Sequence, residues 1–400
     1  MARRIVGLTG NGAAAEAMRQ IDPDVVAAYP ITPQTEIVER FAEYVADGAV
    51  NTEFVTVESE FSAISACCGA SAAGARAMTA TSSQGLALMH EMLYITAGHR
   101  LPVVMVNVNR ALSAPINIHN DHSDSMGSRD AGWIQLYCES AQEVYDSCLQ
   151  AVRIAEHRQV LLPVMVNLDG FVVSHSVERL ELLDDDEVKD FVGEFEPAID
   201  LLDVDNPVTL GALALPEYYF EIKYAQVDAL HRAEEHIRAI DGEFRSRFGR
   251  GYGLIEGYQL EDAELILVTL GSVAGTARVV VDELRLYGQK AGLLKLRCYR
   301  PFPAREVAAA LARARAVAVV EKAVSPGAPA PAVFSDVRNV LYDAAASSGR
   351  YVPAISYVAG PGGRDVPAGS LHRVFEHLRR VAEAGVVGRT VNYLDLRGWE

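Results

Sequence analysis

The sequence predicts an α/β fold made of two doubly wound, parallel-sheet domains, and two observations support this prediction. Short apolar runs alternate with helical patterns along most of the chain, and some of these runs are apolar almost throughout. The chain has 400 residues, of which 50% are hydrophobic, enough for two cores. We therefore expect a first domain over residues 1–250, with a connector from about residue 180, and a second domain over residues 251–400.

The first domain should consist of strands joined by helices in regular alternation. The expected strands cover residues 3–8, 25–28, 77–81, 101–108 and 160–167, and the expected helices cover residues 13–19, 36–45, 62–75, 86–97 and 142–157. Residues 101–108 read Leu-Pro-Val-Val-Met-Val-Asn-Val, a nearly continuous apolar run typical of a parallel strand buried on both faces. Residues 36–45 have the periodicity of an amphipathic helix.

The turn between the first strand and the first helix contains Gly7, Gly10 and Gly12. Their Gly-x-x-Gly-x-Gly spacing differs from the Gly-x-Gly-x-x-Gly spacing of dinucleotide-binding turns. A tight strand-to-helix turn is therefore favoured over a nucleotide site.

A loop with two prolines follows the strand at residues 25–28 and reads Tyr-Pro-Ile-Thr-Pro-Gln-Thr. The prolines restrict its backbone, and ligands of open α/β sheets bind at the carboxyl ends of strands. This loop is well placed for a binding site. The alternative is an ordinary stiff loop in which Thr35 caps the next helix.

The helix expected at residues 62–75 consists, apart from Ile64, only of Ser, Ala, Cys and Gly. Such a helix has no broad polar face, so it should be buried on most sides with other backbones close by. Glu60 lies where this helix should begin. The helix dipole favours its anion and burial favours its neutral form, a balance that suits a proton-sharing role. The alternative is that Glu60 only caps the helix.

Arg110 follows the apolar strand at residues 101–108. It is placed either as a structural ion-pair partner or as a clamp for a carboxylate. The polar segment after it contains four potential metal ligands, His119, Asp121, His122 and Asp124. On a loop this pattern more often bonds to the backbone, so hydrogen bonding is favoured over a metal site.

The acidic run at residues 184–187 begins a connector that reaches about residue 253 and includes a charged helix at residues 227–240. A second α/β pattern follows. Its expected strands cover residues 264–270, 291–296 and 316–320, and its expected helices cover residues 274–287, 305–314 and 332–346. The Gly/Pro/Ala-rich segment at residues 324–331 should be a mobile or interface loop.

Composition excludes several classes of function. The formal net charge of −17 disfavours nucleic-acid binding, and no apolar run is long enough to span a membrane. The N-terminus lacks the apolar core of a secretory signal, so we expect a cytoplasmic protein. The five cysteines, none in a Cys-x-x-Cys spacing, fit buried packing better than disulfides or a metal cluster: Cys67, Cys68, Cys138, Cys148 and Cys298.

With these motifs the chain resembles the α subunit of 2-oxoacid:ferredoxin oxidoreductases, most closely the pyruvate type. The similarity covers essentially the whole chain. Four segments carry it: Tyr-Pro-Ile-Thr-Pro at 29–33, Glu-Ser-Glu at 58–60, Thr-Ser-Ser-Gln-Gly at 81–85 and Asn-Arg-Ala-Leu-Ser-Ala-Pro-Ile-Asn-Ile at 109–118. Further segments extend it: Asn-Asp-His-Ser-Asp at 120–124, Arg-Asp-Ala-Gly-Trp-Ile-Gln at 129–135, Pro-Glu-Tyr-Tyr at 216–219 and Gly-Gly-Arg-Asp-Val at 362–366.

The resemblance implies a first domain that binds the aminopyrimidine of thiamine diphosphate and a second domain like the transketolase C-terminal domain. Glu60 matches the glutamate that shares a proton with the pyrimidine ring and so promotes deprotonation of the thiazolium C2. Thr32 matches a residue near the substrate carboxylate, and threonine there argues against oxalate as substrate. Arg110 matches the carboxylate-binding arginine. Further cofactor contacts are implied for Tyr29, Pro30, Ile31 and Gln84.

The same resemblance implies that other chains complete the enzyme. No Gly-Asp-Gly segment for diphosphate and Mg²⁺ occurs in this sequence, so a β subunit is expected to carry that site. The [4Fe-4S] clusters are expected on γ and δ subunits, with CoA as acyl acceptor and ferredoxin as electron acceptor. The alternatives are a branched-chain or aromatic 2-oxo acid, including a phenylglyoxylate type, a non-catalytic assembly subunit, or a nicotinamide dehydrogenase.

Overall fold

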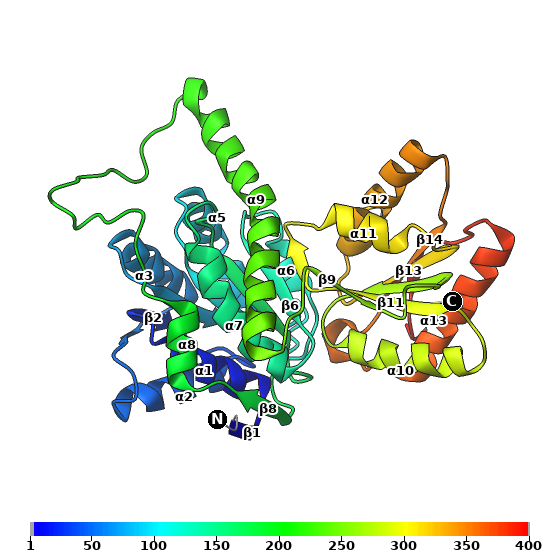
Figure 1. The fold of residues 1–400 in the computed structure, drawn as a ribbon, viewed down its shortest axis with the longest axis horizontal. Helices are drawn as coiled ribbons and strands as arrows, with labels where there is room; N and C mark the ends of the chain where they lie inside the picture. The colour runs from blue at the N-terminus through cyan, green and yellow to red at the C-terminus, as the bar shows by residue number, and fades with distance from the viewer. Residues whose placement is uncertain (1–3, 399–400) are drawn as a thin grey trace.

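In the computed structural model, which describes residues 4–398, two α/β units lie side by side (Figure 1). Each is built around a largely parallel sheet with helices on both faces, so the predicted fold class is confirmed. A small antiparallel pair, β1 (Arg4–Leu8) with β8 (Glu178–Leu182), lies outside both sheets. The predicted first strand agrees with β1, except that Arg3 lies outside the described residues.

The sheet of the first unit has the spatial order β12-β6-β7-β5-β4-β2-β3, seven strands within residues 4–398. Neighbouring strands are parallel except for β12 against β6. The strands are β2 (Val25–Ala28), β3 (Glu53–Thr56), β4 (Ala77–Thr81), β5 (Val104–Asn109), β6 (Ile134–Cys138), β7 (Val164–Asp169) and β12 (Cys298–Arg300). The helices are α1 (Gly10–Ile21), α2 (Thr35–Ala46), α3 (Glu60–Ala72), α4 (Ser83–Leu88), α5 (His90–Gly98), α6 (Ser123–Gly127) and α7 (Ala141–Glu156).

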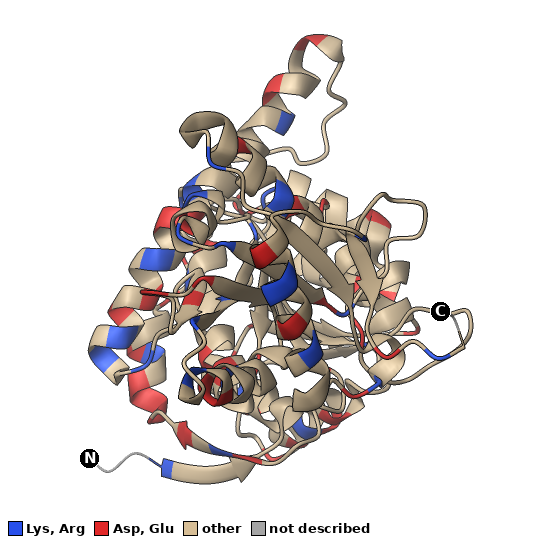
Figure 2. Ribbon diagram, turned by 90° about the vertical axis from the view of Figure 1, so that its right-hand side faces the viewer, with Lys and Arg blue, Asp and Glu red and all other residues tan. Residues whose placement is uncertain are grey.

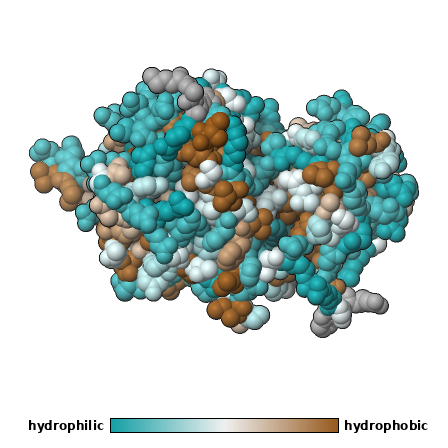
Figure 3. All heavy atoms as spheres, turned by 90° about the horizontal axis from the view of Figure 1, so that it is seen from below, coloured by the Kyte–Doolittle hydropathy of each residue, from teal (hydrophilic) through white to brown (hydrophobic). Residues whose placement is uncertain are grey.

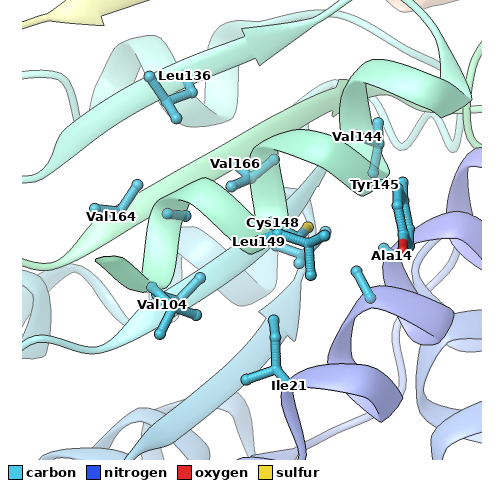
Figure 4. Close-up of a cluster of buried hydrophobic side chains, with 14 of the residues drawn as sticks. Ala14, Ile21, Val104, Leu136, Val144, Tyr145, Cys148, Leu149, Val164 and Val166 are labelled. Carbon is cyan, nitrogen blue, oxygen red and sulfur yellow. The ribbon is translucent and has the colours of Figure 1, made fainter. Parts of the chain in front are cut away.

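Two apolar layers fix this sheet. On one face, α1 and α7 pack against the strands (Figure 4). The helices contribute Ala14, Ile21, Val144, Tyr145, Cys148 and Leu149, and the strands contribute Val104, Leu136, Val164 and Val166. On the other face lie α3 and α5, with Ala63, Cys67 and Leu93 fully buried. The small side chains of α3 let it approach β2 and β4 closely, as the sequence predicted. Burial raises the pKa of the Cys67 thiol to about 12, and all five cysteines are buried and free, as expected.

The sequence did not predict several elements, among them the strands β3, β6, β8 and β12 and the helices α4 and α6. It also did not predict β9 (Ile255–Tyr258), β14 (Ala354–Val358), β15 (Val391–Tyr393), α8 (Asp185–Val192) and α13 (Ala368–Ala384). β3 has only four residues with charged or polar ends, and β6 contains the polar Gln135, so neither gives a clear apolar run. α1 begins at Gly10, where a side chain would come within 2.6 Å of the Val173 carbonyl oxygen. The glycine turn is thus the tight strand-to-helix turn that the spacing favoured.

The connector contains α8 (Asp185–Val192) and the long α9 (Pro216–Phe248). The charged helix predicted at residues 227–240 is only the middle of α9. The first turns of α9 project beyond the body of the first unit (Figure 1) and expose Tyr218, Tyr219 and Phe220. Such an exposed aromatic segment is typical of a protein interface.

The sheet of the second unit has the order β15-β14-β13-β10-β11-β9, six strands within residues 4–398, with only β9 antiparallel to its neighbour. The strands are β9 (Ile255–Tyr258), β10 (Leu265–Thr269), β11 (Ala291–Leu296), β13 (Ala316–Glu321), β14 (Ala354–Val358) and β15 (Val391–Tyr393). The helices are α10 (Val273–Leu286), α11 (Ala304–Leu311), α12 (Ala332–Ser348) and α13 (Ala368–Ala384), with a short 3₁₀ turn at Pro361–Gly363. One core contains α11 and α12 and the other α10 and α13.

Strand pairing and a buried ion pair connect the two units in addition to the linker. β12 lies after β11 in the sequence but pairs with β6 of the first sheet. Beside it, Lys295 is 1% exposed and donates to Glu143 of α7 at 2.7 Å. The domain boundary at residue 250 remains a prediction. β12 lies beyond this boundary in the sequence, yet it belongs to the sheet of the first unit.

The surface is mixed in character. Acidic and basic residues are interspersed on the face in Figure 2, and Figure 3 shows small apolar patches among larger hydrophilic areas. Among residues 4–398, none of the helices combines the length and apolar content that crossing a bilayer requires.

Candidate functional site

The predicted site residues lie at one edge of the first sheet. β2, β3, β4 and β5 run parallel, so their carboxyl ends meet at the same edge. Four segments leave that edge: residues 29–34 after β2, Glu60 after β3, residues 82–85 after β4, and Arg110 after β5. This is where open α/β sheets bind their ligands.

Glu60 is the first residue of α3 and is 7% exposed. Ser59, not Glu60, caps the helix, because the Ser59 hydroxyl accepts from the Ser62 amide at 3.3 Å. The Glu60 carboxylate has no hydrogen-bond or ion-pair partner among residues 4–398. The alternative that Glu60 serves as the cap is therefore wrong, and its carboxylate is left available to a ligand.

The turn after β4 packs directly on Glu60. A side chain at Gly85 would lie 2.8 Å from Cγ and Oε1 of Glu60 and 2.4 Å from Oγ1 of Thr81. Only glycine permits this close approach. Gln84, beside it, is half-buried and accepts from the Ser83 hydroxyl at 2.7 Å.

Glu58 has a different environment although it is only two residues away. It is exposed, and its carboxylate accepts a hydrogen bond from the Ser62 hydroxyl. That hydrogen bond holds the pKa of Glu58 below its ordinary value. Of the two carboxylates, only that of Glu60 is buried without a partner in the described chain.

Arg110 and the loop after β2 are in direct contact. Arg110 is 7% exposed, and its Nη1 donates to the Thr32 carbonyl at 2.8 Å. Its Nε donates to the Asn117 carbonyl at 3.0 Å. These two bonds leave most of the guanidinium N–H donors of Arg110 unpaired within residues 4–398. Burial lowers the pKa of Arg110, and the nearby charge of Asp124 partly opposes this effect.

The rest of the loop after β2 is held by Gln34. Its side chain accepts from the Ile31 amide at 3.2 Å and donates to the Ala80 carbonyl of β4 at 3.0 Å. Tyr29, 37% exposed, and Pro30 and Thr32 remain at the surface. Thr35 is the first residue of α2 with no side-chain cap at that helix start, so the capping role considered for it is wrong.

Asp124 organises this site, and sequence reasoning missed its role. It is 3% exposed, and its Oδ2 accepts from the amides of Ser83 at 3.0 Å and Arg110 at 3.1 Å. Its Oδ1 accepts from the Asn109 side chain at 2.8 Å and the Ser125 amide at 2.7 Å. One carboxylate thereby joins the turn facing Glu60 to the start of the Arg110 loop. Burial raises the Asp124 pKa despite these bonds.

A second buried aspartate, Asp169 at the end of β7, joins the two units. Its carboxylate contacts His122 Nε2 at 2.7 Å, Lys322 Nζ at 2.8 Å and the Ser272 amide at 3.1 Å. Burial alone would raise the Asp169 pKa, but Lys322 and His122 hold it well below its ordinary value. Within residues 4–398 no group of three potential ligands is arranged to hold a metal ion; His122 and Asp124 make hydrogen bonds instead.

Two of the sequence motifs, more than two hundred residues apart, also meet here. Asn117 donates to the Gly362 carbonyl at 3.0 Å, and the Gly362 amide donates to Asp121 at 3.2 Å. The second unit therefore supports the loop that holds Arg110 in place.

Comparison with known families agrees with this geometry. The family model for the thiamine-diphosphate-binding region of pyruvate flavodoxin/ferredoxin oxidoreductase matches residues 16–242. The model for core domain II of pyruvate:ferredoxin oxidoreductase matches residues 263–371.

Curated relatives match along almost the whole chain. The pyruvate synthase subunit PorA of Thermotoga maritima is 53% identical over 98% of this chain and 98% of its own length. The subunit PorA of Methanocaldococcus jannaschii is 47% identical over 94% and 95%. The ketoisovalerate oxidoreductase subunit VorA of Pyrococcus horikoshii is 41% identical over 98% of both chains.

Solved structures share the fold. The 2-oxoglutarate:ferredoxin oxidoreductase of Magnetococcus marinus aligns with a TM-score of 0.71 at 20% identity, over 94% of this chain and 66% of the longer one. A split-gene transketolase, solved as an inactive β4 tetramer, aligns with a TM-score of 0.51 at 12% identity, over 95% and 97%. Together with the family matches, these results show that the chain belongs to the pyruvate flavodoxin/ferredoxin oxidoreductase family, as a thiamine-diphosphate-dependent 2-oxoacid:ferredoxin oxidoreductase subunit of the pyruvate synthase type.

Proposed function

We propose that this chain is the α subunit that supplies the pyrimidine-binding half of the active site of a pyruvate synthase. The reaction is the oxidative decarboxylation of pyruvate with CoA to acetyl-CoA and CO₂, with the electrons passed to ferredoxin. The observation that carries the proposal is the Glu60 carboxylate at the sheet edge, which is 7% exposed and has no hydrogen-bond or ion-pair partner within residues 4–398. A ring nitrogen of the cofactor would supply a hydrogen-bond partner for this carboxylate.

The residues present fit thiamine diphosphate at this edge of the sheet. When bound, the cofactor supplies the carbanion chemistry needed to cleave the bond to the 2-oxo acid carboxylate. Glu60 would hold and move a proton at the pyrimidine nitrogen. The Gly85 turn presses Glu60 from one side, which fixes the direction of its carboxylate, and Gln84 with Tyr29, Pro30 and Ile31 would border the ring.

Arg110 would bind the carboxylate of the 2-oxo acid. Its bonds to the carbonyls of Thr32 and Asn117 fix the guanidinium while leaving donors free. A planar guanidinium binds a carboxylate through two parallel hydrogen bonds. Thr32, whose carbonyl faces Arg110, would lie next to the bound substrate.

Other chains would complete the enzyme. A β subunit would carry the diphosphate and Mg²⁺ site, because this sequence has no Gly-Asp-Gly segment. Clusters of the [4Fe-4S] type would lie on γ and δ subunits. This agrees with the five cysteines of this chain, which are all buried and dispersed.

A branched-chain 2-oxo acid is the second candidate substrate. It is motivated by the ketoisovalerate oxidoreductase subunit at 41% identity. Pyruvate is preferred because several pyruvate synthase subunits are 45–53% identical. Relative kcat/KM values of the assembled enzyme for pyruvate and 2-oxoisovalerate distinguish the two.

The test of the proposed function is the rate of hydrogen–deuterium exchange at C2 of the cofactor in the assembled complex. Glu60→Gln keeps the size of the side chain but cannot relay the proton, so the exchange rate should fall by about 10²–10⁴-fold. Glu58→Gln is the matched control and should change the rate little, since Glu58 is exposed. Wild-type exchange in the Glu60→Gln complex would refute the role of Glu60.

A further inference from the structure

A cavity of about 190 Å³ lies between the two units, away from Glu60. Its walls come from Asn120, before α6, from the start of α10, from Lys322 at the end of β13, and from residues 363–367. Neither family match nor the proposed chemistry assigns it a role.

Asn120 is the unusual residue of this cavity. Its side chain is 1% exposed, and neither its oxygen nor its nitrogen has a hydrogen-bond partner within residues 4–398. Buried amides are normally paired, because an unpaired one loses its hydration without compensation. Since this amide lines the cavity, a ligand there would supply the missing bonds.

The other polar groups of the cavity are mainly hydrogen-bond donors. Lys322 donates to Asp169 at 2.8 Å and to the Ser272 hydroxyl at 3.0 Å, and keeps a further N–H. Thr276 and the first turn of α10 also face the cavity. The N-terminus of a helix carries partial positive charge, which suits an anion. At the start of α10 the amides of Ser272, Ala274 and Gly275 already have partners, so the helix contributes this charge rather than free amides.

The charged side chains around the cavity also bear on whether an anion binds there. Arg364 lies on its wall, and Asp365 is exposed beside it. Two further acids lie nearby, and both are engaged. Asp169 contacts Lys322, His122 and Ser272, and Asp121 accepts from the Gly362 amide. Arg364 donates through Nη1 to the Asp395 carbonyl and keeps its other donors for a ligand, whereas Asp365 is the group that would repel an anion.

We propose that this interdomain cavity binds a free oxyanion of the size of inorganic phosphate, held by Asn120, Lys322, Arg364 and the N-terminus of α10. Its volume is below the range of about 300–1,000 Å³ typical of sites for larger organic ligands. The site is independent of the proposed catalytic role of Glu60.

Binding there joins the two units. Asn120 belongs to the loop of the first unit that holds Arg110, whereas Lys322 and Arg364 belong to the second unit. Gly363 packs so closely on this loop that a side chain would lie 2.3 Å from Cβ of His119. An anion in the cavity therefore stabilises the contact between the units, and the thermal midpoint should rise with phosphate concentration.

The test is calorimetric titration of the purified full-length chain with inorganic phosphate, at an ionic strength held constant with chloride. Saturable binding by the wild type is expected. Arg364→Ala should weaken it about tenfold, because a charge-assisted hydrogen bond is lost. Arg389→Ala removes an exposed charge elsewhere in the same unit and should leave the affinity unchanged. Asp365→Asn should tighten binding about threefold by removing repulsion.

Asn120→Leu separates a ligand contact from a structural amide. Leucine has a similar size and leaves no unpaired polar atom, so the phosphate-free variant should be at least as stable as wild type while binding phosphate about tenfold more weakly. A less stable variant with unchanged affinity would overturn the proposal. Absence of saturable phosphate binding by the wild type would overturn it too, and the Arg364 and Asp365 variants carry the test if Asn120→Leu does not fold.

Discussion

Asp124 should act as a positioning residue for the catalytic site, and two substitutions separate its effects. Asp124→Ala removes an acceptor from five donors: the amides of Ser83, Arg110 and Ser125 and the side chains of Asn107 and Asn109. The two asparagine side chains keep other acceptors, Asn167 and Ser125, whereas the three backbone amides lose theirs. Asp124→Asn keeps one oxygen. Because Oδ1 of Asn109 has no partner within residues 4–398, the Asn109 amide can turn and accept from the new side chain.

The bonds give the expected magnitudes. A buried donor left without a partner costs about 1–3 kcal/mol. Water entering the space of the removed carboxylate satisfies part of the three unpaired amides, so Asp124→Ala should lose about 3–5 kcal/mol of unfolding free energy. Asp124→Asn keeps the bonds to Ser83 and Arg110 and loses chiefly the Ser125 bond, about 1 kcal/mol.

The assay combines urea unfolding of the chain with steady-state kinetics of the assembled enzyme. Asp241→Ala is the control, because Asp241 is 3% exposed and accepts from the amides of Tyr252 and Gly253, far along the chain from the site. Both alanine variants should lose similar stability, but only Asp124→Ala should raise the KM for the 2-oxo acid. Equal kinetics in the two variants would show that Asp124 is merely structural.

Two further predictions concern single residues. Arg110→Leu should raise the KM for the 2-oxo acid by on the order of ten- to a hundredfold, measured on the assembled enzyme; unchanged kinetics would make Arg110 structural. Glu321 is 2% exposed, and burial raises its pKa to about 7 although the amides of Val333 and Phe334 donate to it. Glu321 therefore stays protonated to a higher pH in the folded chain than in the unfolded chain. Its contribution to the unfolding free energy should be fully present below about pH 4.5 and should fall by roughly 3 kcal/mol as the pH rises to about 7. The unfolding free energy of wild type minus that of Glu321→Gln should therefore decline over this range, and a flat difference would contradict the assignment.

The sequence predicted the edge at which the site forms, because apolar runs identify parallel strands and their carboxyl ends must meet. Residues 29–33, Glu60, Gln84 and Arg110 accordingly lie along that edge. The small-residue pattern likewise predicted the close packing of α3. These features are local, so a pattern of neighbouring residues is enough to reveal them.

The bonds that hold the site together are not local. Asp124 reaches backward along the sequence to Ser83, and Asp169 reaches forward to Ser272 and Lys322. In the sequence Asp124 is one of several polar loop residues, and its pattern fits a metal ligand as well as a backbone acceptor. Similarly, no periodicity indicates that β12 leaves the second unit to pair with β6.

The buried acids of the chain differ in one respect that bears on function. Asp124, Asp169 and Glu321 each accept several hydrogen bonds, whereas Glu60, which is 7% exposed, accepts none within residues 4–398. A carboxylate without a partner in the chain contributes no hydrogen bond or ion pair to the stability of the isolated chain. Glu60→Gln should therefore leave the unfolding free energy of the isolated chain nearly unchanged, although it slows C2 exchange in the complex. A structural acid would show the opposite pattern, a loss of stability with exchange unchanged, so unfolding and exchange measured on this one variant decide whether Glu60 serves the fold or the cofactor.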